Sequence, residues 1–395
     1  IAGSGTADIA VTGTGNVELN GITSATATGH VLVATSNGNI NVNGAVGTQS
    51  GNIGLEAIGA TSDITANANI VSGTGNVIIV ADRDVTQNDS GDIRTSQANV
   101  LIDAGHNWSM TSDAEVVSTA GSVGGITHTG EIALGKITAD HVALQSAQSI
   151  YDANGTQINV AAKTLSMVAK ESIGDQSSPG TTPSLNADAI DTSVETLAAS
   201  SNHGLFINES DSLIVDTITR QTIGGMSFGT VAGLSSHNSD VLLNVGESLA
   251  LNQSVNAGTA DLRIIANGDV NQSASGTIIA DEFGLQQRST KSGDVTLFAA
   301  NDVNVIAATN LFDGGNLTFA DSDDLTIRTV SSQTVGQIVF NPTTGLQATG
   351  GDIHIQAQRD LTIVRSITSM NGVVDSTSAS GESIVLESVD GNILI

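Results

Sequence analysis

A short tripeptide recurs along this 395-residue chain and constrains its fold more than any other feature. It consists of Gly, then Asn or Asp, then a branched aliphatic residue, and a run of alternating apolar and polar residues follows it. Alternation with a period of two is typical of a strand with one buried face. The copies begin at Gly15, Gly38, Gly51, Gly75, Gly91, Gly268, Gly293, Gly315, Gly351 and Gly391. We therefore expect an array of short strands joined at tight corners, where Gly and Asn adopt a positive φ at low cost.

The spacing of the first inward aliphatic residue of each strand predicts how the strands are arranged. Two interleaved series are Val17, Ile40 and Ile64, and Val31, Ile53, Val77 and Val100. Within each series the spacing is nearly constant, although strands that follow one another in the chain are unevenly spaced. A fixed period of about 22–24 residues, with more than one strand per repeat, is typical of a solenoid. The sequence predicts an all-β, right-handed parallel β-helix over residues 1–395, with rungs of about 22–24 residues and about 17 or 18 turns.

The second half of the chain carries strand couplets, in which a second strand starts soon after the first. The couplets are Val241/Leu249, Leu262/Val270, Val295/Val303, Leu317/Leu325 and Ile353/Leu361. From Val241 to Leu262, and from Val295 to Leu317, the spacing matches one rung. From Leu262 to Val295, and from Leu317 to Ile353, it is longer, and these two separations are expected to mark loop insertions.

The middle of the chain is less regular. Residues 174–201 are rich in Ser and Thr and hold Pro179 and Pro183, so we expect a loop excursion from the solenoid there. Residues 161–171 fit a short helix or a strand, and the surrounding pattern favours the strand. The sequence starts at Ile1 and stops inside a strand pattern, from which we expect a piece of a longer repeat protein.

Charge and composition exclude several classes of protein. The net charge of −28 opposes binding to nucleic acid or to anionic lipid. The absence of Cys removes disulfide frameworks and thiolate metal sites. No run approaches the roughly 18 apolar residues of a membrane-spanning helix. We therefore expect neither a nucleic-acid partner nor membrane insertion.

Two couplets resemble repeats of a known class of bacterial surface protein. Residues 293–305 (GDVTLFAANDVNV) and 351–363 (GDIHIQAQRDLTI) resemble repeats of filamentous-haemagglutinin-like adhesins, and the stretch from Gly130 to Gly174 resembles repeats of very large bacterial surface exoproteins. The resemblance implies a right-handed β-helix exported by two-partner secretion or as an autotransporter passenger. It also implies an extracellular or cell-surface location and a role as an adhesive rod or a biofilm-matrix scaffold.

The corner Asn residues are candidates for a structural ladder. Asn16 and Asn39 are separated by one rung, and so are Asn52 and Asn76. Equivalent positions on successive rungs of a β-helix lie above one another, so these side chains are expected to form a hydrogen-bonded ladder along the solenoid.

The Asp residues raise the question of a cation. Asp269 and Asp294 are about one rung apart and could stack, and Asp82, Asp84, Asp321, Asp323 and Asp324 lie in two acidic clusters. Stacked carboxylates repel one another, and Ca²⁺ prefers oxygen ligands. Solvated turn carboxylates explain the same residues, and the chain has no known calcium repeat. We therefore expect no cofactor and retain the clusters as calcium candidates.

Catalysis is the alternative class of function. Polysaccharide-degrading β-helices use carboxylates, with a basic residue in some, on an outer face. The candidates are Asp323 and Asp324 with Arg328, or Asp82 and Asp84 with Arg83. With one Trp and one Tyr, the chain is poor in the aromatic residues that line sugar clefts. We expect a non-catalytic structural or adhesive segment that associates with itself, end to end or side by side, or binds a surface glycan or protein receptor. A polysaccharide-degrading enzyme and a glycan-binding module remain the alternatives.

Overall fold

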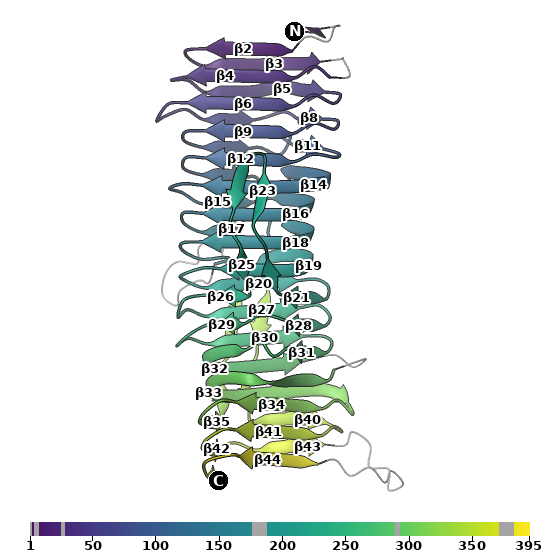
Figure 1. The fold of residues 1–395 in the computed structure, drawn as a ribbon, viewed down its shortest axis with the longest axis vertical. Coiled ribbons are helices and arrows are strands. Elements are labelled where there is room, and N and C mark those ends of the chain that lie inside the picture. Colours follow the sequence, from purple (N-terminus) through teal and green to yellow (C-terminus); the bar gives the residue numbers. More distant parts are fainter. Residues whose placement is uncertain (1, 4–7, 25–27, 176–187, 289–292, 371–382) are drawn as a thin grey trace. The chain divides into compact units, whose positions relative to one another are not determined.

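The computed structural model describes residues 2–3, 8–24, 28–175, 188–288, 293–370 and 383–395. Their regular structure consists of β-strands, which stack in parallel as a β-solenoid of about 15 turns (Figure 1). The prediction of an all-β parallel β-helix is thus confirmed. The described residues contain no helix that is long and apolar enough to cross a membrane. There are fewer turns than expected, because several turns are longer than the predicted rung: Leu205 pairs with Val241, Leu317 with Ile353, and Ile353 with Ile384.

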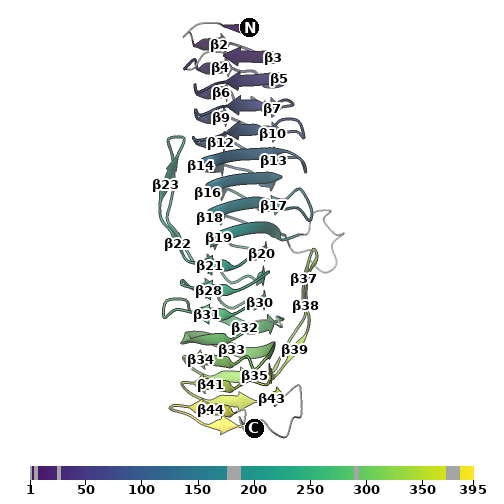
Figure 2. The same cartoon turned by 90° about the vertical axis from the view of Figure 1, so that its right-hand side faces the viewer.

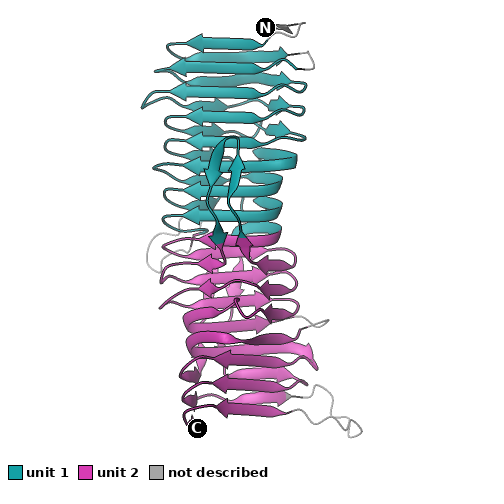
Figure 3. Cartoon of the chain, viewed as in Figure 1, with its two compact units in different colours: residues 1–174, 190–194, 218–231 teal, residues 175–189, 195–217, 232–395 magenta. Residues whose placement is uncertain are grey.

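The chain divides into two compact units (Figure 3). Unit 1 comprises residues 1–174, 190–194 and 218–231, and unit 2 comprises residues 175–189, 195–217 and 232–395. Each unit is described by itself.

Unit 1 has three faces, each a stack of parallel strands. Face 1 holds β2 (Ile9–Gly13), β4 (Val31–Ser36), β6 (Ile53–Ile58), β9 (Val77–Ala81), β12 (Val100–Ala104) and the second halves of β14 (Glu115–Thr127), β16 (Lys136–Ser146) and β18 (Val160–Ala169). Face 2 holds the first halves of β3 (Val17–Ser24) and β5 (Ile40–Thr48), then β7 (Ile64–Ala66), β10 (Val85–Gln87), β13 (Trp108–Met110), β15 (Ile132–Leu134) and β17 (Ile150–Asp152). Face 3 holds β1 (Ala2–Gly3), the second halves of β3 and β5, then β8 (Ile70–Ser72), β11 (Ile93–Thr95) and the first halves of β14, β16 and β18.

The register of unit 1 agrees with the predicted spacing. Val31 pairs with Ile53, which pairs with Val77, and Val17 pairs with Ile40. Ile40, Ile53 and Val77 are 0% exposed, so the aliphatic side chains stack inside the solenoid. Burying one such side chain contributes about 1.5–3 kcal/mol. Residues 161–171, which fitted a helix or a strand, lie largely in β18.

The expectation that the corner glycines have positive φ is wrong. Of the ten, only Gly15 has a positive φ, of 157°. The glycines are instead needed because adjacent turns approach closely. A Cβ on Gly51 would lie 2.1 Å from the carbonyl oxygen of Gly29, and one on Gly351 would lie 2.1 Å from that of Gly315. Any larger residue at these positions pushes two turns apart.

Unit 2 also consists of three stacks. One holds β20 (Leu205–Glu209), β27 (Val241–Val245), β30 (Leu262–Ala266), the second half of β32 (Ile278–Gln287), the later part of β33 (Val295–Asp313), β40 (Leu346–Thr349) and β43 (Ile367–Met370). The next holds β21 (Leu213–Val215), β28 (Leu249–Leu251), β31 (Val270–Gln272), the start of β33, β34 (Leu317–Asp321), β41 (Ile353–Ala357) and β44 (Ile384–Ser388). The third holds β26 (Leu234–Ser235), β29 (Val255–Asn256), the start of β32, the middle of β33, β35 (Leu325–Ile327), β42 (Leu361–Ile363) and β45 (Ile393–Leu394).

One of the two predicted insertions between couplets is wrong. Val295 pairs with Val270, the second member of the preceding couplet, whereas Leu262 pairs with Phe283. The long separation of Leu262 and Val295 therefore reflects a change of face, because the couplet starts one face later. The separation of Leu317 and Ile353 is a true insertion, since these two residues pair across it.

The structure describes only part of the predicted excursion over residues 174–201. Residues 176–187 lie outside the described residues. Ile190–Ser200 form strand β19, and within unit 2 its residues Ala199 and Ser200 pair with β26. The excursion therefore does not extend over residues 190–200.

Candidate functional site

The predicted ladder residues lie at corners of unit 1, and their side chains bond to the backbone of the next turn. Asn16 Oδ1 accepts a hydrogen bond from the N–H of Asn39 at 3.0 Å, and Asn52 Oδ1 accepts one from the N–H of Asn76 at 2.9 Å. Asn39 and Asn76 accept the corresponding N–H of the turn that follows, each at 2.9 Å. The bonds run from side chain to backbone rather than between amide side chains. Each gives a partner to a corner N–H, which is a structural role.

Other polar side chains make the same bond at equivalent corners. Asp269 Oδ1 accepts the N–H of Asp294 at 3.1 Å, and Asp294 Oδ1 accepts the N–H of Asn316 at 2.9 Å. In unit 1, His30 Nδ1 accepts the N–H of Asn52 at 2.8 Å. The stacked Asp residues thus have backbone donors as partners, which accounts for the Asn-or-Asp choice in the tripeptide.

Asp82 and Asp84 face different partners. Asp82 Oδ2 accepts the N–H of Gly59 at 2.7 Å, whereas Asp84 Oδ1 lies 2.8 Å from His106 Nδ1. Arg83 forms an ion pair with Asp63, and its Nε lies 3.4 Å from Asp84 Oδ2. Arg83 and Asp84 therefore share a contact with each other, whereas Asp82 bonds to a different corner.

Asp321 is a buried carboxyl group with two backbone donors. Its exposed fraction is 4%, and its oxygen atoms accept the N–H groups of Val303 and Asp323, each at 3.0 Å. Burial raises the pKa of Asp321 to about 7, and the neighbouring Asp323 carboxylate adds to this shift. Asp323 Oδ1 is buried without a hydrogen-bond partner among the described residues.

The basic residue beside this cluster is not the one predicted. Arg359 Nη2 lies 2.8 Å from Asp323 Oδ2 and 3.4 Å from Asp324 Oδ2. Arg328, the predicted partner, instead forms an ion pair with Glu282. Asp323 and Arg359 each lie two residues before a paired strand start, at Leu325 and Leu361, and this register brings the two side chains into contact. Among the described residues, no three His, Asp or Glu side chains converge to hold a metal ion.

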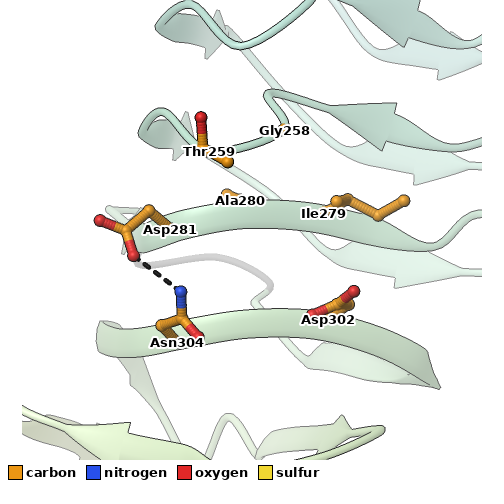
Figure 4. Close-up of a pocket in the computed structure, with 7 residues that line it drawn as sticks. All are labelled: Gly258, Thr259, Ile279, Ala280, Asp281, Asp302 and Asn304. Carbon is orange, nitrogen blue, oxygen red and sulfur yellow. Dashed lines mark hydrogen bonds between the residues drawn. The ribbon is translucent and has the colours of Figure 1, made fainter.

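A surface hollow of about 500 Å³ lies in unit 2 (Figure 4). It is lined by Gly258, Thr259, Ile279, Ala280, Asp281, Asp302 and Asn304. Asn304 Nδ2 donates a hydrogen bond to Asp281 Oδ1 at 2.8 Å. The sequence did not single out these residues, because they are brought together only by the pairing of Ile279 with Asp302. These lining residues offer hydrogen-bonding oxygen atoms but no aromatic ring and no basic side chain.

Two β-hairpins outside the solenoid were not predicted from the sequence (Figure 2). Hairpin 1 consists of β23 (Gln221–Ile223) and β24 (Met226–Phe228), and short strands β22 (Thr217–Ile218) and β25 (Val231–Ala232) lead into and out of it. Hairpin 2 consists of β37 (Gln333–Val335) and β38 (Ile338–Phe340), flanked by the pair β36 (Thr329–Val330) and β39 (Thr343–Thr344).

The two hairpins are related in sequence. Gln-Thr-Ile-Gly begins at Gln221 and Gln-Thr-Val-Gly begins at Gln333, and Phe228 and Phe340 are separated by the same offset as these two glutamines. The turn glycines Gly224 and Gly336 have φ values of 59° and 53°, a conformation that favours Gly. This gap-free repeat is the signal that could have revealed the hairpins.

Each hairpin covers apolar residues on the outer side of a stack. Hairpin 1 places Ile223 and Phe228 against three buried residues of unit 1, which are Leu101, Ile126 and Ala143. Hairpin 2 covers an apolar cluster of unit 2 that consists of Ala189, Phe206, Leu242, Ile265, Val305 and Ala307. Both hairpins therefore fasten several successive strands of one unit.

Polar contacts also hold hairpin 2. Arg263, whose side chain is 3% exposed, donates to the backbone oxygen of Ser331 at 3.0 Å and pairs with Asp261 at 2.9 Å. Its guanidinium carbon lies 6.0 Å from the centre of the Phe340 ring. Gln333 Nε2 donates to Asp240 Oδ2 at 3.1 Å, and burial raises the pKa of Asp240.

The fold defines the class of this chain as a β-solenoid repeat protein. Comparison with protein-family models, with curated proteins and with solved structures finds no match.

Proposed function

We propose that this chain is a non-catalytic structural or adhesive segment of a large secreted or surface-displayed bacterial protein. Its solenoid acts as a stiff spacer in the extracellular space. Adhesive contact with a glycan or protein receptor, or association between copies, takes place on its outer surface. The proposal needs neither a cofactor nor a metal ion.

The observation that carries this proposal is the in-register stacking of parallel strands within each unit. Ile53, Val77 and Val100 follow one another on face 1 of unit 1 without a break in register, and each is 0% exposed. Corner side chains bond each turn to the next, as Asn52 does with Asn76. These turns are thus held to their neighbours by backbone hydrogen bonds, by aliphatic contacts and by corner bonds, a construction that we expect to resist bending and stretching.

Single-molecule stretching tests the mechanical part of the proposal. Releasing one turn of about 22–24 residues adds about 80 Å of chain, at about 3.5 Å per residue. We expect a series of force peaks whose spacing is that length or a multiple of it. Extension at low force in a single featureless step would contradict the proposal. Release of reducing ends from a panel of polysaccharides, lost in the Asp323→Ala variant, would contradict the non-catalytic part.

A further inference from the structure

One row of outward-facing residues on face 1 of unit 1 is apolar along most of its length. In register, strand after strand, it comprises Ala10, Leu32, Gly54, Ile78, Leu101, Gly124 and Ala143. Hairpin 1 covers the part of this row from Leu101 to Ala143, and Ile78 packs against the edge of the same cluster. The row continues past the hairpin to Leu32, which is 50% exposed.

Each hairpin places its Phe ring over an outward glycine. A Cβ on Gly124 would lie 2.7 Å from Cε2 of Phe228, and a Cβ on Gly284 would lie 2.5 Å from Cζ of Phe340. The rings therefore occupy the space that a side chain would fill at either glycine. The same arrangement occurs in unit 1 and in unit 2, with hairpins of related sequence, so the outward glycine is a recurring docking position for an aromatic ring.

A third outward glycine, Gly54, has no ring over it among the described residues. We define the Gly54 surface as Leu32, Gly54 and Ile78, which are direct register neighbours. Its pattern of aliphatic, Gly and aliphatic residues matches that of Leu101, Gly124 and Ala143. Within the described part of the chain, the only atom within 4 Å of a Cβ built on Gly54 is Cδ1 of Leu32, at 2.9 Å, so the half-exposed Leu32 side chain must rotate aside for a ring to dock. The surface is continuous with the hairpin 1 interface through Ile78.

We propose that the Gly54 surface docks a β-hairpin of a partner protein, an uncharged hairpin that carries a Phe on its second strand. Charge supports this choice of occupant. The two hairpins already docked in this way, residues 221–228 and 333–340, contain no charged side chain. The whole chain, by contrast, has a net charge of −28. An uncharged hairpin approaches this acidic chain without like-charge repulsion. This docking proposal does not depend on the proposed role as a stiff spacer, which the stretching experiment tests separately.

A fluorescent hairpin peptide tests the proposal on the full chain. The probe spans residues 221–228, which contain no charged side chain, and is closed by a disulfide between Cys residues added at its ends. Gly54→Val fills the position that the ring would occupy, and Leu32→Lys places a charge on the surface without changing Gly54. The matched control is Gly47→Val, because a Cβ on this outward glycine meets only the oxygen of Val71 at 3.8 Å among the described residues. Fluorescence anisotropy measures binding, and emission from Trp108 verifies the folding of each variant.

We expect the peptide to bind the natural chain and Gly47→Val equally. We expect binding to Gly54→Val and to Leu32→Lys, and binding of a Phe228→Ala peptide to the natural chain, to be about tenfold weaker or lost. If the chain alone forms dimers that Leu32→Lys abolishes, a second copy covers the surface and the proposed occupant is overturned. Absence of binding overturns the proposal. Equal binding to both Gly54→Val and Leu32→Lys also overturns it, because the peptide would then be displacing hairpin 1 from Gly124.

Discussion

Gly51→Ala is predicted to destabilise unit 1, although it adds a single methyl group at the surface corner of a turn. A Cβ at Gly51 would lie 2.1 Å from the carbonyl oxygen of Gly29, whereas such atoms are ordinarily about 3.5 Å apart. The two turns must therefore separate locally by about 1 Å. The change is chosen because it removes no contact, so any loss of stability reports the close approach itself.

The cost follows from the bonds that this separation breaks. The N–H of Asn52 donates to His30 Nδ1 at 2.8 Å, and the N–H of Val31 donates to the oxygen of Asn52 at 3.0 Å. Each bond contributes about 1 kcal/mol net, and overpacking adds about 1–3 kcal/mol. Removing Gly from the unfolded chain returns about 0.5–1 kcal/mol. We expect a net loss of about 3 kcal/mol and a fall in Tm of roughly 6–12 °C.

Trp108 provides the assay, because it is the only Trp in the chain and is 0% exposed in unit 1. Its emission reports unfolding of this unit by urea or by heat. Gly47→Ala is the matched control, since its Cβ meets only the oxygen of Val71 at 3.8 Å among the described residues. We expect this control to be as stable as the natural chain or slightly more so. Equal stability of Gly51→Ala and Gly47→Ala would refute the explanation of the corner glycines.

Three further predictions concern buried groups. The unfolded Asp321 carboxyl ionises near pH 4, whereas burial raises its pKa in the folded chain to about 7. The folded state therefore holds the extra proton between these values, and stability falls as the pH rises through them. Urea unfolding at pH 5 and pH 8 should show that the free energy of unfolding falls between these values by on the order of 3 kcal/mol less in Asp321→Asn than in the natural chain. An unchanged pH dependence would contradict this assignment. Gly125→Ala should lower the free energy of unfolding by about 2 kcal/mol and change the emission of Trp108, because the added Cβ would lie 2.3 Å from the indole Cζ3. Unchanged emission and stability would argue against this packing. Arg263→Ala should speed hydrogen exchange in residues 333–340 about a hundredfold, by a loss of about 3 kcal/mol, and unchanged exchange would show that the apolar contacts alone hold hairpin 2.

The stacking of the first turns of unit 1 could be predicted from the sequence, because Gly followed by Asn or Asp recurs where these turns touch. The spacing of Val31 and Ile53 predicts their pairing directly. The change of face at Val295 could not be predicted in this way. The offset from Leu262 to Val270 equals that from Val295 to Val303 although these couplets occupy different pairs of faces, so the offset does not say which pair a couplet occupies.

The surroundings of the side chains were harder to predict than the stacking. The contact of Arg359 with Asp323 follows from the alignment of the couplets at Leu361 and Leu325, a signal that the choice of Arg328 overlooked. The hairpins add no period of their own, and their relation appears only when distant segments are compared, as with Phe228 and Phe340. The row that contains Gly54 needs the complete register of face 1 before its members can be seen as neighbours.

The absence of Cys allows a direct test of the stacked register by engineered disulfides. Thr65 and Thr86 are register partners on adjacent turns, and Ser109 is the partner of Thr86 one turn further on. Adjacent parallel strands place paired Cα atoms about 4.8 Å apart, within the range that a disulfide spans, whereas two turns place them about 9.6 Å apart, beyond it. We predict that Thr65→Cys/Thr86→Cys forms an internal disulfide on mild oxidation and that Thr65→Cys/Ser109→Cys does not, as measured by mass spectrometry of unreduced digests. Failure of the first pair, or efficient closure of the second, would contradict a parallel solenoid.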